Sequence, residues 1–385
     1  MKCGYYEAGA CRSCTLIDTP YSLQLEQRVN TARDLLATVN TAENMTWLPP
    51  QTSPERGFRV KAKMAVGGSA DNPTLGLLDP AWKGVDLSEC PILAPELRHA
   101  MPRLRTFIAQ LHLTPYDVRL RRGELKYVIV TASHTGDLMV RFILRSRRYL
   151  TLLTQSLPLL RQVLPNARVI TANIHPIHAA VLEGPEEIVL TEQTTLPMEV
   201  GDIVLHAGPR SFTQTNTVVA GALYRQVGQW ANLPLGPSER PSSVWDLYCG
   251  IGGFALHASH LGIPHAIGVE ISDTAIASAQ HTATTMSLDG TRFVASDAIS
   301  WAVQHEVTQA PNVVVVNPPR RGLGPELTSW LDSCTASRVI YSSCNPKSLA
   351  RDLRALPSLR VCEGRLFDMF PHTQHAEVAV LCERV

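Results

Sequence analysis

Residues 244–254 read Val-Trp-Asp-Leu-Tyr-Cys-Gly-Ile-Gly-Gly-Phe, an apolar run that leads through an acidic residue into a glycine-rich turn. Glycines at such a turn let the backbone approach a ligand closely and start a helix without a clash at Cβ. The glycine spacing differs from the G-x-G-x-x-G of dinucleotide-binding turns, and an acidic residue precedes it. The stretch therefore predicts a strand, a ligand-binding turn and a helix over 254–261, with a ligand other than a dinucleotide.

The same order of strand, turn and helix recurs through the C-terminal half of the chain. Further strands are predicted at 265–270, 292–294, 313–316, 339–341 and 377–382, with a helix over 273–286. This alternation predicts a doubly wound, Rossmann-like α/β domain over residues 211–385, built on a parallel sheet. Ligands of such sheets bind at the carboxyl ends of the strands, where the motifs described below lie.

The preceding part of the chain has a different pattern, with short strands from residue 58 to about 205. Runs at 127–131 and 138–144 flank His-Thr-Gly-Asp at 134–137, which is a hairpin signal, and a second such pair is expected from 187–190 and 200–205. One helix, over 94–113, interrupts these strands, and a separate, mostly polar helix is predicted before them over 21–36. These features predict an α+β, mostly antiparallel middle domain over residues 58–210.

Length and composition limit the class of protein. A chain of 385 residues that is 45% hydrophobic and 18% charged is expected to form two or three globular domains. No apolar run approaches the roughly 18 residues of a membrane span, and residues 1–6 lack the apolar stretch of a signal peptide. We expect a cytoplasmic protein with no membrane partner.

Net charge is +1, but charge is unevenly distributed along the chain. Between Val118 and Arg148 the chain has eight basic residues and only two acidic ones, Glu124 and Asp137. Contact with phosphate groups requires such an excess of positive charge. A solvated face of a sheet is the alternative interpretation. The stretch is therefore a candidate RNA-binding surface.

Four of the nine cysteines form a group of their own near the N-terminus: Cys3, Cys11, Cys14 and Cys90. An odd number of cysteines in a cytosolic chain does not indicate a disulfide framework. Four thiolates suit zinc or a [4Fe–4S] cluster, and the seven-residue gap with a distal Cys-Pro favours the cluster. Four ordinary buried cysteines are the alternative. The predicted cluster would hold an N-terminal segment, residues 1–90, to the middle domain.

Polar residues at three points fit S-adenosylmethionine as the ligand of the C-terminal domain. Glu270 ends the second strand, where it can hold both ribose hydroxyls of an adenosyl group. Asp297 follows the third strand and can accept a hydrogen bond from the adenine amine. Gln214, within Phe-Thr-Gln-Thr-Asn at 212–216, can reach the methionine end, although a helix N-cap region is the alternative interpretation of that segment.

Residues 341–346, Tyr-Ser-Ser-Cys-Asn-Pro, put Cys344 at the exit of a predicted strand. Methylation of oxygen, nitrogen or sulfur needs no thiol, whereas C5 of a pyrimidine becomes nucleophilic only after addition at C6. A cysteine thiolate is suited to that addition. A buried structural cysteine is the alternative.

Two further motifs complete a catalytic set with Cys344. The prolines of Asn317-Pro-Pro-Arg320 fix the chain and direct Asn317 into the site. Amine methyltransferases that act on adenine use a related turn followed by an aromatic residue, and here two arginines follow instead. Glu377 ends Pro-His-Thr-Gln-His-Ala-Glu at 371–377 and offers a carboxylate as a base.

On these motifs the chain resembles the RNA uracil-5-methyltransferases. The matching segments, in family order, are the Gln214 segment, Asp-Leu-Tyr-Cys-Gly at 246–250, Glu270, the Pro-Pro-Arg turn, Ser-Cys-Asn-Pro at 343–346 and the 371–377 motif. The resemblance implies Cys344 as nucleophile, Glu377 as base, and donor contacts from Gln214, Tyr248, Glu270, Asp297 and Asn317. It also implies a [4Fe–4S] cluster on Cys3, Cys11, Cys14 and Cys90.

Within the family, the subgroup that methylates uridine 747 of 23S rRNA fits best. That subgroup starts at its cysteine cluster without a preceding β-barrel, and it carries Asn rather than Asp before Pro-Pro-Arg, as at Asn317. The target base must leave its stack, so we expect the substrate to be a loop or unpaired uridine. Nothing in the sequence demands more than a monomer. The change from Asp to Asn leaves the role of Asn317 open between the donor and the uracil edge.

Three alternatives to this function stay open on the sequence. The first is uracil-5 methylation of another 23S rRNA site or of tRNA. The second is an amine methyltransferase acting on adenine or glutamine, favoured by Asn317-Pro-Pro. The third is a non-enzymatic iron–sulfur RNA-binding factor or chaperone with a vestigial methyl-donor fold.

Overall fold

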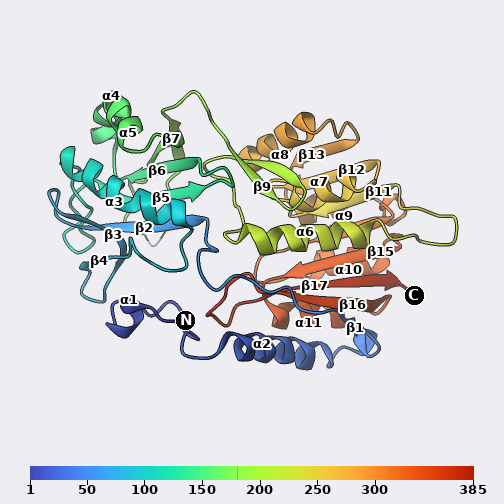
Figure 1. Ribbon diagram of the computed structural model, residues 1–385. Helices are drawn as coiled ribbons and strands as arrows, with labels where there is room; N and C mark the ends of the chain where they lie inside the picture. The colour runs from blue at the N-terminus through green and yellow to red at the C-terminus, as the bar shows by residue number, and fades with distance from the viewer. Residues whose placement is uncertain (180) are drawn as a thin grey trace. The chain divides into compact units, whose positions relative to one another are not determined.

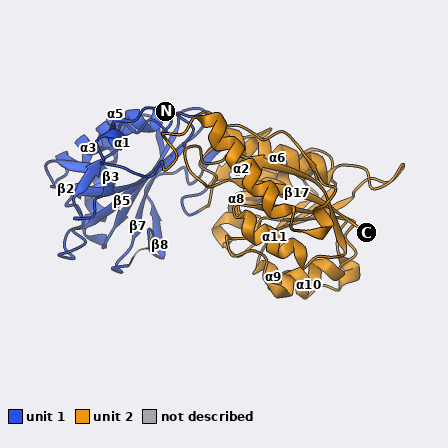
Figure 2. Ribbon diagram, turned by 90° about the horizontal axis from the view of Figure 1, so that it is seen from below, with its two compact units in different colours: residues 1–14, 55–198, 208–210 blue, residues 15–54, 199–207, 211–385 orange. Residues whose placement is uncertain are grey.

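The computed structural model describes residues 1–179 and 181–385, which divide into two compact units (Figure 2). Unit 1 holds residues 1–14, 55–198 and 208–210, and unit 2 holds residues 15–54, 199–207 and 211–385. Residues 15–54, which the sequence analysis placed in an N-terminal segment 1–90, therefore lie in unit 2. Their helix has an apolar face, including Val29, Ala32 and Leu36, that is buried in the core of unit 2.

Unit 2 is built on an eight-stranded sheet in the order β1-β16-β17-β15-β14-β11-β12-β13 (Figure 1). The strands are β1 (Thr46–Trp47), β11 (Ser243–Leu247), β12 (His265–Glu270), β13 (Thr291–Ala295), β14 (Val313–Val316), β15 (Arg338–Ser343), β16 (Leu359–Phe367) and β17 (Glu377–Arg384). The α/β fold and the positions of six of these strands are confirmed. The sheet is mixed rather than parallel, because β17 pairs antiparallel with both β15 and β16.

Helices cover both faces of this sheet. The helices of unit 2 are α2 (Tyr21–Leu36), α6 (Thr217–Ala231), α7 (Gly253–His260), α8 (Asp273–Thr285), α9 (Ala298–Val303), α10 (Pro325–Ser333) and α11 (Pro346–Arg354), with short 3-10 turns η1 (Asn40–Ala42) and η3 (Val307–Gln309). One core joins α2, α9, α10 and α11 to the strands. The four valines of β14 are fully buried, as expected for a central strand covered on both faces.

The order of the strands determines where a ligand can bind in unit 2. In the sheet, β12 and β13 lie on one side of β11, whereas β14 and β15 lie on the other side of β11. Such a reversal opens a crevice at the carboxyl ends of the strands. The glycine-rich turn after β11, the Asn317 turn after β14 and Cys344 after β15 all lie at that edge.

Unit 1 contains a seven-stranded sheet in the order β4-β3-β2-β5-β6-β7-β8. Its elements are α1 (Gly4–Glu7), β2 (Lys61–Gly68), β3 (Pro73–Leu78), β4 (Gly84–Asp86), α3 (Pro95–Gln110), β5 (Leu125–Ala132), β6 (Leu138–Leu144), η2 (Arg147–Tyr149), α4 (Leu150–Gln155), α5 (Leu157–Val163), β7 (Ala167–Ile174) and β8 (Glu186–Val189). All neighbours are antiparallel except β6 and β7. The hairpin over 127–144 is confirmed as β5 and β6.

The second predicted hairpin is wrong. The strand at 187–190 is β8, which pairs with β7 instead of the segment 200–205. That segment contributes to β10 (Ile203–Ala207), whose partner is β9 (Leu196–Val200). The prediction missed β7 and β9, which are the actual partners of the two strands, so it paired 187–190 and 200–205 with each other.

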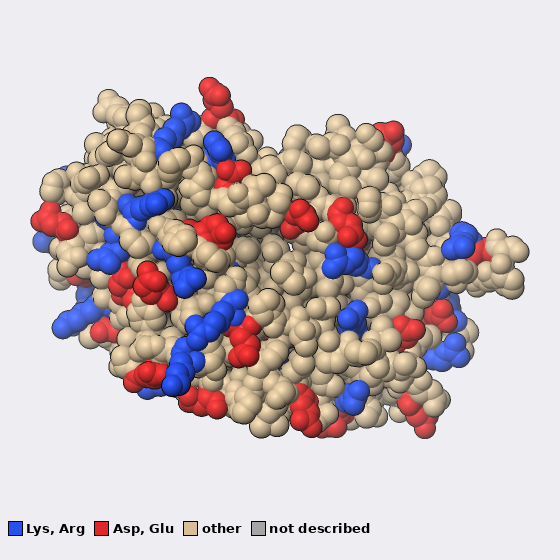
Figure 3. Space-filling model, viewed as in Figure 1, with Lys and Arg blue, Asp and Glu red and all other residues tan. Residues whose placement is uncertain are grey.

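The basic stretch 118–148 is less exposed than its sequence suggested. Arg141 is fully buried, with its guanidinium 2.9 Å from Glu183 and also paired with Glu187. Arg145 pairs with Glu124 at 2.8 Å, and Arg147 pairs with Glu186. On the face shown in Figure 3, basic and acidic side chains are interspersed. Much of the local positive charge is therefore neutralised within unit 1.

The helices over residues 1–179 and 181–385 include none with the length and apolar character that crossing a membrane requires.

Candidate active site

The turn after β11 leaves room for a ligand beside its backbone. Tyr248, Gly250 and Gly252 have φ of 67°, 55° and 82°, so the chain turns through left-handed conformations. A Cβ added to Gly250 would meet nothing within 4 Å, which shows open space at this point. The Glu270 carboxylate borders that space, accepting from the Gly250 N–H at 3.3 Å and the Ser272 N–H at 3.1 Å.

Asp246 contributes a buried carboxylate below the same turn. Its Oδ2 accepts from the Ala255 N–H at 2.9 Å, whereas its Oδ1 is buried with no partner in the described part of the chain. Burial, with a smaller contribution from the Glu270 charge, raises the pKa of Asp246 to about 7. A buried carboxylate oxygen without a partner suits a cationic or hydrogen-bond-donating group.

The Gln214 segment has unused hydrogen-bonding capacity as well. Asn216 caps α6, since its side chain accepts from the Val219 N–H at 3.3 Å. The hydroxyls of Thr213 and Thr215 are buried and lack partners among residues 1–179 and 181–385. The N-cap is therefore Asn216, which leaves the half-buried Gln214 available to a polar ligand.

Asp297 and Tyr248 lie near each other on the other side of the turn. Asp297 caps α9 through its Oδ1, 2.9 Å from the Ser300 N–H, and that hydrogen bond lowers its pKa. Burial raises the pKa of Tyr248 to about 12, with a further contribution from Asp297 and an opposing one from Arg321. The exposed Asp297 retains its second oxygen for an acceptor role.

Taken together, these residues fit S-adenosylmethionine by their chemistry. The donor carries an ammonium group, ribose hydroxyls and an adenine amine, all of which donate hydrogen bonds. The turn offers open space, an unpaired carboxylate oxygen at Asp246, and free acceptor capacity at Glu270 and Asp297.

Cys344 and Glu377 come together at the ends of two paired strands. Ser343 of β15 lies opposite Val378 of β17, so Cys344 and Glu377 occupy the same edge of the sheet. Burial raises the pKa of Cys344, the Glu377 charge raises it further, and Arg320 lowers it through its charge and a hydrogen bond to the thiol. A nucleophile, a carboxylate and a cation are thus in mutual reach.

Glu377 is held in a protein environment that favours its neutral form. Its side chain is buried and accepts from the Ser342 hydroxyl at 2.6 Å. Burial raises the pKa of Glu377 to about 7, with only that hydrogen bond opposing it. A carboxylate with such a pKa can accept a proton near neutral pH.

Asn317 lies between the donor residues and the cysteine. It follows β14, which pairs with β11 on one side and β15 on the other. Its N–H donates to the Leu247 carbonyl at 3.4 Å, and its side chain is half-buried. This position is compatible with contact to either the donor or the substrate base.

A cavity of about 480 Å³ opens beside Cys344 within unit 2. Residues 344–347 and 374–376 form one wall, and α2 forms another with Gln24, Gln27, Arg28 and Thr31. None of the described residues that line it is acidic. A polar cavity without carboxylates is suited to an uncharged or anionic substrate.

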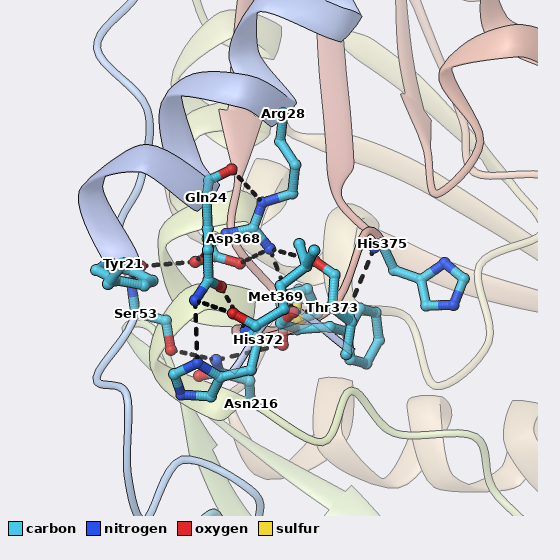
Figure 4. A network of polar contacts seen from close by, with 12 residues as sticks. Tyr21, Gln24, Arg28, Ser53, Asn216, Asp368, Met369, His372, Thr373 and His375 are labelled. Atoms are coloured by element: carbon cyan, nitrogen blue, oxygen red, sulfur yellow. Dashed lines mark hydrogen bonds and ion pairs between the residues drawn. The ribbon is translucent and has the colours of Figure 1, made fainter. Parts of the chain in front are cut away.

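A buried polar network fixes α2 against the loop that leads to Glu377 (Figure 4). Arg28 pairs with Asp368 at 2.9 Å and donates to the carbonyls of Phe370 and Thr373. Tyr21 donates to Asp368 at 2.6 Å. Because the central Arg28–Asp368 pair is buried and its partners are hydrogen-bonded, the network holds residues 368–373 in one conformation.

The amide of Gln24 extends this network toward the N-terminal side. Its Nε2 donates to the carbonyls of Leu16 and Thr19, and its Oε1 accepts from the His372 N–H at 2.9 Å. The Leu16 N–H in turn donates to the His372 carbonyl at 2.9 Å. His372 has a φ of 64°, an uncommon conformation that these contacts stabilise.

The four N-terminal cysteines are partly buried free thiols in unit 1. The described residues contain no group of three or more His, Cys, Asp or Glu side chains close enough for a single metal ion. The Cys14 thiol nevertheless lies near the other three, since burial together with the charges of Cys90, Cys11 and Cys3 raises the pKa of Cys14 to about 11. Four thiols that influence one another in this way are a candidate ligand set for a metal centre.

Arg59 supplies a cation beside these thiols. Burial lowers its pKa, whereas Cys90 and Cys14 raise it. Its Nε is buried without a hydrogen-bond partner in the described part of the chain. A buried guanidinium of this kind favours ionised thiols, which metal binding requires.

The sequence analysis did not identify Arg320, Ser342 or the α2 residues as parts of the site. Arg320 was visible only as the residue after two prolines, and its position beside the thiol depends on the path of that turn. Ser342 is adjacent to the cysteine motif, and its alternation along a strand could have indicated a side chain facing β17. Arg28 gave no local signal, because its partner Asp368 is 340 residues away in the sequence.

Comparisons with known proteins agree with these features. Residues 186–385 match a family model described as tRNA (Uracil-5-)-methyltransferase. A Halothiobacillus neapolitanus protein named 23S rRNA (uracil(747)-C(5))-methyltransferase RlmC is 43% identical over 387 residues, covering 100% of both chains. A Shewanella loihica protein of the same name is 40% identical over 386 residues, again covering 100% of both.

A solved structure extends the similarity to three dimensions. The crystal structure of Pyrococcus abyssi tRNA (uracil-54, C5)-methyltransferase in complex with S-adenosyl-L-homocysteine has a TM-score of 0.78 and 25% sequence identity. The match covers 96% of this chain and 85% of that chain.

Proposed function

The chain belongs to the RNA uracil-5-methyltransferase family, and from this premise we propose that it transfers a methyl group from S-adenosylmethionine to C5 of a uridine in 23S rRNA. The observation that carries the proposal is the grouping of Cys344, Glu377 and Arg320 at the carboxyl edge of the sheet, beside the donor residues. Methylation of a pyrimidine carbon is the reaction that needs a thiol there.

The uridine is proposed as the one at position 747, because the relatives that match along the full chain carry that position in their names. A tRNA uridine is the second candidate, since the Pyrococcus abyssi structure is a tRNA enzyme. The Pyrococcus abyssi enzyme is 25% identical in sequence to this chain, well below the 40–43% identity of the relatives named as 23S rRNA enzymes. The RNA substrate also supports the expected cytoplasmic location, and the monomeric state stays a prediction.

Cys344 opens the proposed reaction. Its thiolate adds to C6 of the flipped uracil, which gives the ring enolate character and makes C5 nucleophilic. C5 then forms a bond to the methyl group that S-adenosylmethionine supplies, and the donor's sulfur takes the electron pair of the broken bond. Arg320 favours the thiolate through its positive charge.

Glu377 closes the reaction. It removes the proton from C5, and the electrons of that C–H bond reform the C5–C6 double bond as the thiolate leaves. The Ser342 hydroxyl holds the carboxylate in place at 2.6 Å. Its pKa of about 7 suits a base that must release the proton again near neutral pH.

The donor is proposed to bind between Gln214, Tyr248, Glu270, Asp297 and Asn317. The unpaired Oδ1 of Asp246, which the sequence analysis did not assign, adds an acceptor for the donor's ammonium group. These roles are supported by the free acceptor capacity around the turn.

We also propose a [4Fe–4S] cluster on Cys3, Cys11, Cys14 and Cys90, with a structural role. The mutual proximity of the thiols and the buried Arg59 beside them support this assignment. Methyl transfer moves no electrons, so the cluster is expected to stabilise residues 1–14 rather than to take part in catalysis.

Nucleoside mass spectrometry tests the proposed function. The purified protein is incubated with S-adenosylmethionine labelled at the methyl group and with unmodified 23S rRNA or tRNA. Labelled 5-methyluridine in 23S rRNA alone is the expected result, and position 747 is then checked by fragment mapping. Product in tRNA alone would contradict the substrate, a labelled exocyclic amine would contradict the reaction, and the absence of any product would favour a binding factor.

A further inference from the structure

Unit 1 contains a cavity of about 350 Å³ that lies apart from the cysteine group. It is formed on the sheet by β2, β3 and β5, together with the segments that follow α3 and β7. Its walls are mainly aromatic and aliphatic, with two histidines and one lysine, and none of the described lining residues is acidic. The residues that decide its chemistry are Trp82, Tyr116, Lys126, Tyr127, His175 and His178.

Trp82 presents an unusually exposed aromatic ring at this cavity. It is the only tryptophan of unit 1, its side chain is 53% exposed, and its φ is 65°. The turn around it is tightly bonded, since the Trp82 N–H donates to the Asp79 carbonyl at 2.8 Å. Glycine is the usual residue at such a φ, so a tryptophan here accepts backbone strain while exposing a large apolar ring.

Lys126 is directed into the cavity by a β-bulge. The pairing of β5 with β6 shifts between Leu125 and Tyr127, so Lys126 is the extra residue. Its Nζ donates to the Ile177 carbonyl at 2.7 Å and lies 4.8 Å from the centre of the Tyr116 ring. Bulges of this type occur where a strand must reorient a side chain next to a binding site.

His175 offers a buried hydrogen-bond acceptor. Its side chain is 2% exposed, and its Nε2 is 2.7 Å from the Val181 carbonyl, which can only accept a hydrogen bond. Nε2 therefore carries the proton, and in the neutral ring Nδ1 is an acceptor. Burial and the nearby Lys126 lower the pKa of His175, which favours that neutral ring. Nδ1 is buried with no partner in the described part of the chain.

Tyr116 completes an aromatic wall that is fixed in position. Its hydroxyl is 3.0 Å from His178 Nδ1, and the two rings are 6.2 Å apart at an angle of 51°. The ring is thus held by hydrogen bonding on one side and by Lys126 on the other. A rigid ring loses little entropy when a second ring stacks on it.

We propose that this cavity binds one unstacked nucleobase of the RNA substrate, with the base against Trp82 and Tyr116 and one of its N–H groups donating to His175 Nδ1. This inference rests on the proposed function, because it assumes that RNA is the substrate. A nucleobase has the required flat π-face and N–H edge, and aromatic stacking is the general means of holding splayed bases. The absence of lining carboxylates suits an adjacent phosphate backbone.

Equilibrium binding of a labelled 23S rRNA fragment that contains uridine 747 tests the proposal without requiring methyl transfer. Trp82→Ala is expected to weaken binding by about tenfold or more, the size of one lost base–aromatic stack. Trp82→Phe is expected to restore most of the affinity. The matched control is Val189→Ala on β8, which removes another exposed apolar side chain, 37% exposed, outside the cavity.

A second measurement addresses the hydrogen bond. His175→Ala, with folding checked by its melting temperature, is expected to weaken RNA binding as well, while the affinity for S-adenosylmethionine stays within about twofold of the wild type. Photocrosslinking of 4-thiouridine RNA to the wild-type protein, followed by peptide mass spectrometry, is expected to label Trp82 or Tyr116. This readout does not depend on the folding of a variant.

The outcomes separate this inference from the proposed function. Unchanged RNA affinity in Trp82→Ala, in a wild type that binds and methylates the RNA, would overturn the inference alone. A wild type that does not bind or methylate 23S rRNA would overturn the proposed function. Crosslinking confined to residues outside the cavity would likewise exclude a nucleobase there and leave a peptide or small molecule as its ligand.

Discussion

In the proposed reaction Cys344 must be ionised to attack C6, yet burial and Glu377 both raise the pKa of its thiol. Arg320 is the group that opposes them. The resting site thus holds a protonated thiol, and an incoming RNA that displaces water or shifts Arg320 would change that balance. The reactivity of this residue is therefore set by its two neighbours rather than by its own sequence motif.

Cys344→Ala is expected to abolish 5-methyluridine formation, because no other side chain of the site can add to C6. Binding of S-adenosylmethionine, measured by calorimetry, is expected to stay within about twofold of the wild type. Cys362→Ala, a half-buried thiol on β16, is the matched control and should retain full activity. Turnover above a tenth of the wild-type rate in Cys344→Ala would exclude the nucleophile role.

The raised pKa of Glu377 leads to a second prediction, which concerns how the free energy of unfolding depends on pH. The folded protein retains the Glu377 proton up to about pH 7, whereas an unfolded chain releases it near ~4.3. The folded state binds more protons between these values, so the stability from this group is present below about pH 4 and lost as the pH rises to 7.

Glu377→Gln is therefore expected to be more stable than the wild type at pH 8, by on the order of 3–4 kcal/mol, and equal to it near pH 4. Urea unfolding at the two pH values measures this. Glu306→Gln changes an exposed carboxylate and should show no such trend. A constant difference between Glu377→Gln and the wild type across the pH range would show that the carboxyl is not buried as described.

At the scale of elements, helix α2 is joined to the loop before β17 by the Arg28–Asp368 pair, whose side chains are 6% and 0% exposed. Arg28→Ala leaves Asp368 buried without a counter-charge, and we expect it to cost about 3–5 kcal/mol of unfolding free energy. The turnover rate should also fall, because the loop leading to Glu377 loses its support, while donor binding is retained.

The double variant Arg28→Met with Asp368→Asn provides the control for this pair. Removing both charges leaves no unpaired ion, so its loss in chemical denaturation should be smaller than that of Arg28→Ala alone. Additive losses would mean that the two side chains do not interact. A normal turnover rate in Arg28→Ala would mean that the loop does not depend on α2.

Most elements of unit 2 could be predicted from the sequence, because their apolar runs are bounded by glycine, proline and polar residues. β11, β12 and β14 fall within a residue of their predicted limits. β16 was missed, since Arg360, Glu363 and Arg365 interrupt its apolar pattern. The antiparallel direction of β17 was also missed, because a strand's direction depends on its connection and not on its own residues.

The residues of the site could be predicted from the sequence where they belong to short, contiguous motifs. Cys344 and Asn317 lie directly after strands and Glu270 ends one, at the edge where sheet geometry brings ligand-binding residues together. Arg320 beside the thiol and the unpaired Oδ1 of Asp246 depend on the path of turns, which no spacing rule provides. The contribution of α2 depends on a contact across 340 residues.

At the scale of the whole molecule, the cysteine group predicts a metal-dependent unit 1. Protein purified without oxygen is expected to be brown and to contain about four irons per chain, and a Cys90→Ser variant to lose them. Loss of the cluster should lower the melting temperature and increase proteolysis of residues 1–14, because so short a segment cannot fold alone. A colourless, zinc-loaded protein would refute this assignment.

The packing of helix α2 in unit 2 affects how the chain folds while the ribosome synthesises it. Helix α2 packs against segments such as α11 and residues 368–373, which are translated more than 300 residues later. At roughly 5–20 residues per second, the apolar face of α2 waits on the order of 15–60 seconds for its partners. Val29, Ala32 and Leu36 would be exposed throughout that delay. The nascent chain therefore needs either a transient cover for this helix or protection by a chaperone, and the enzyme gains its active site only at the end of translation.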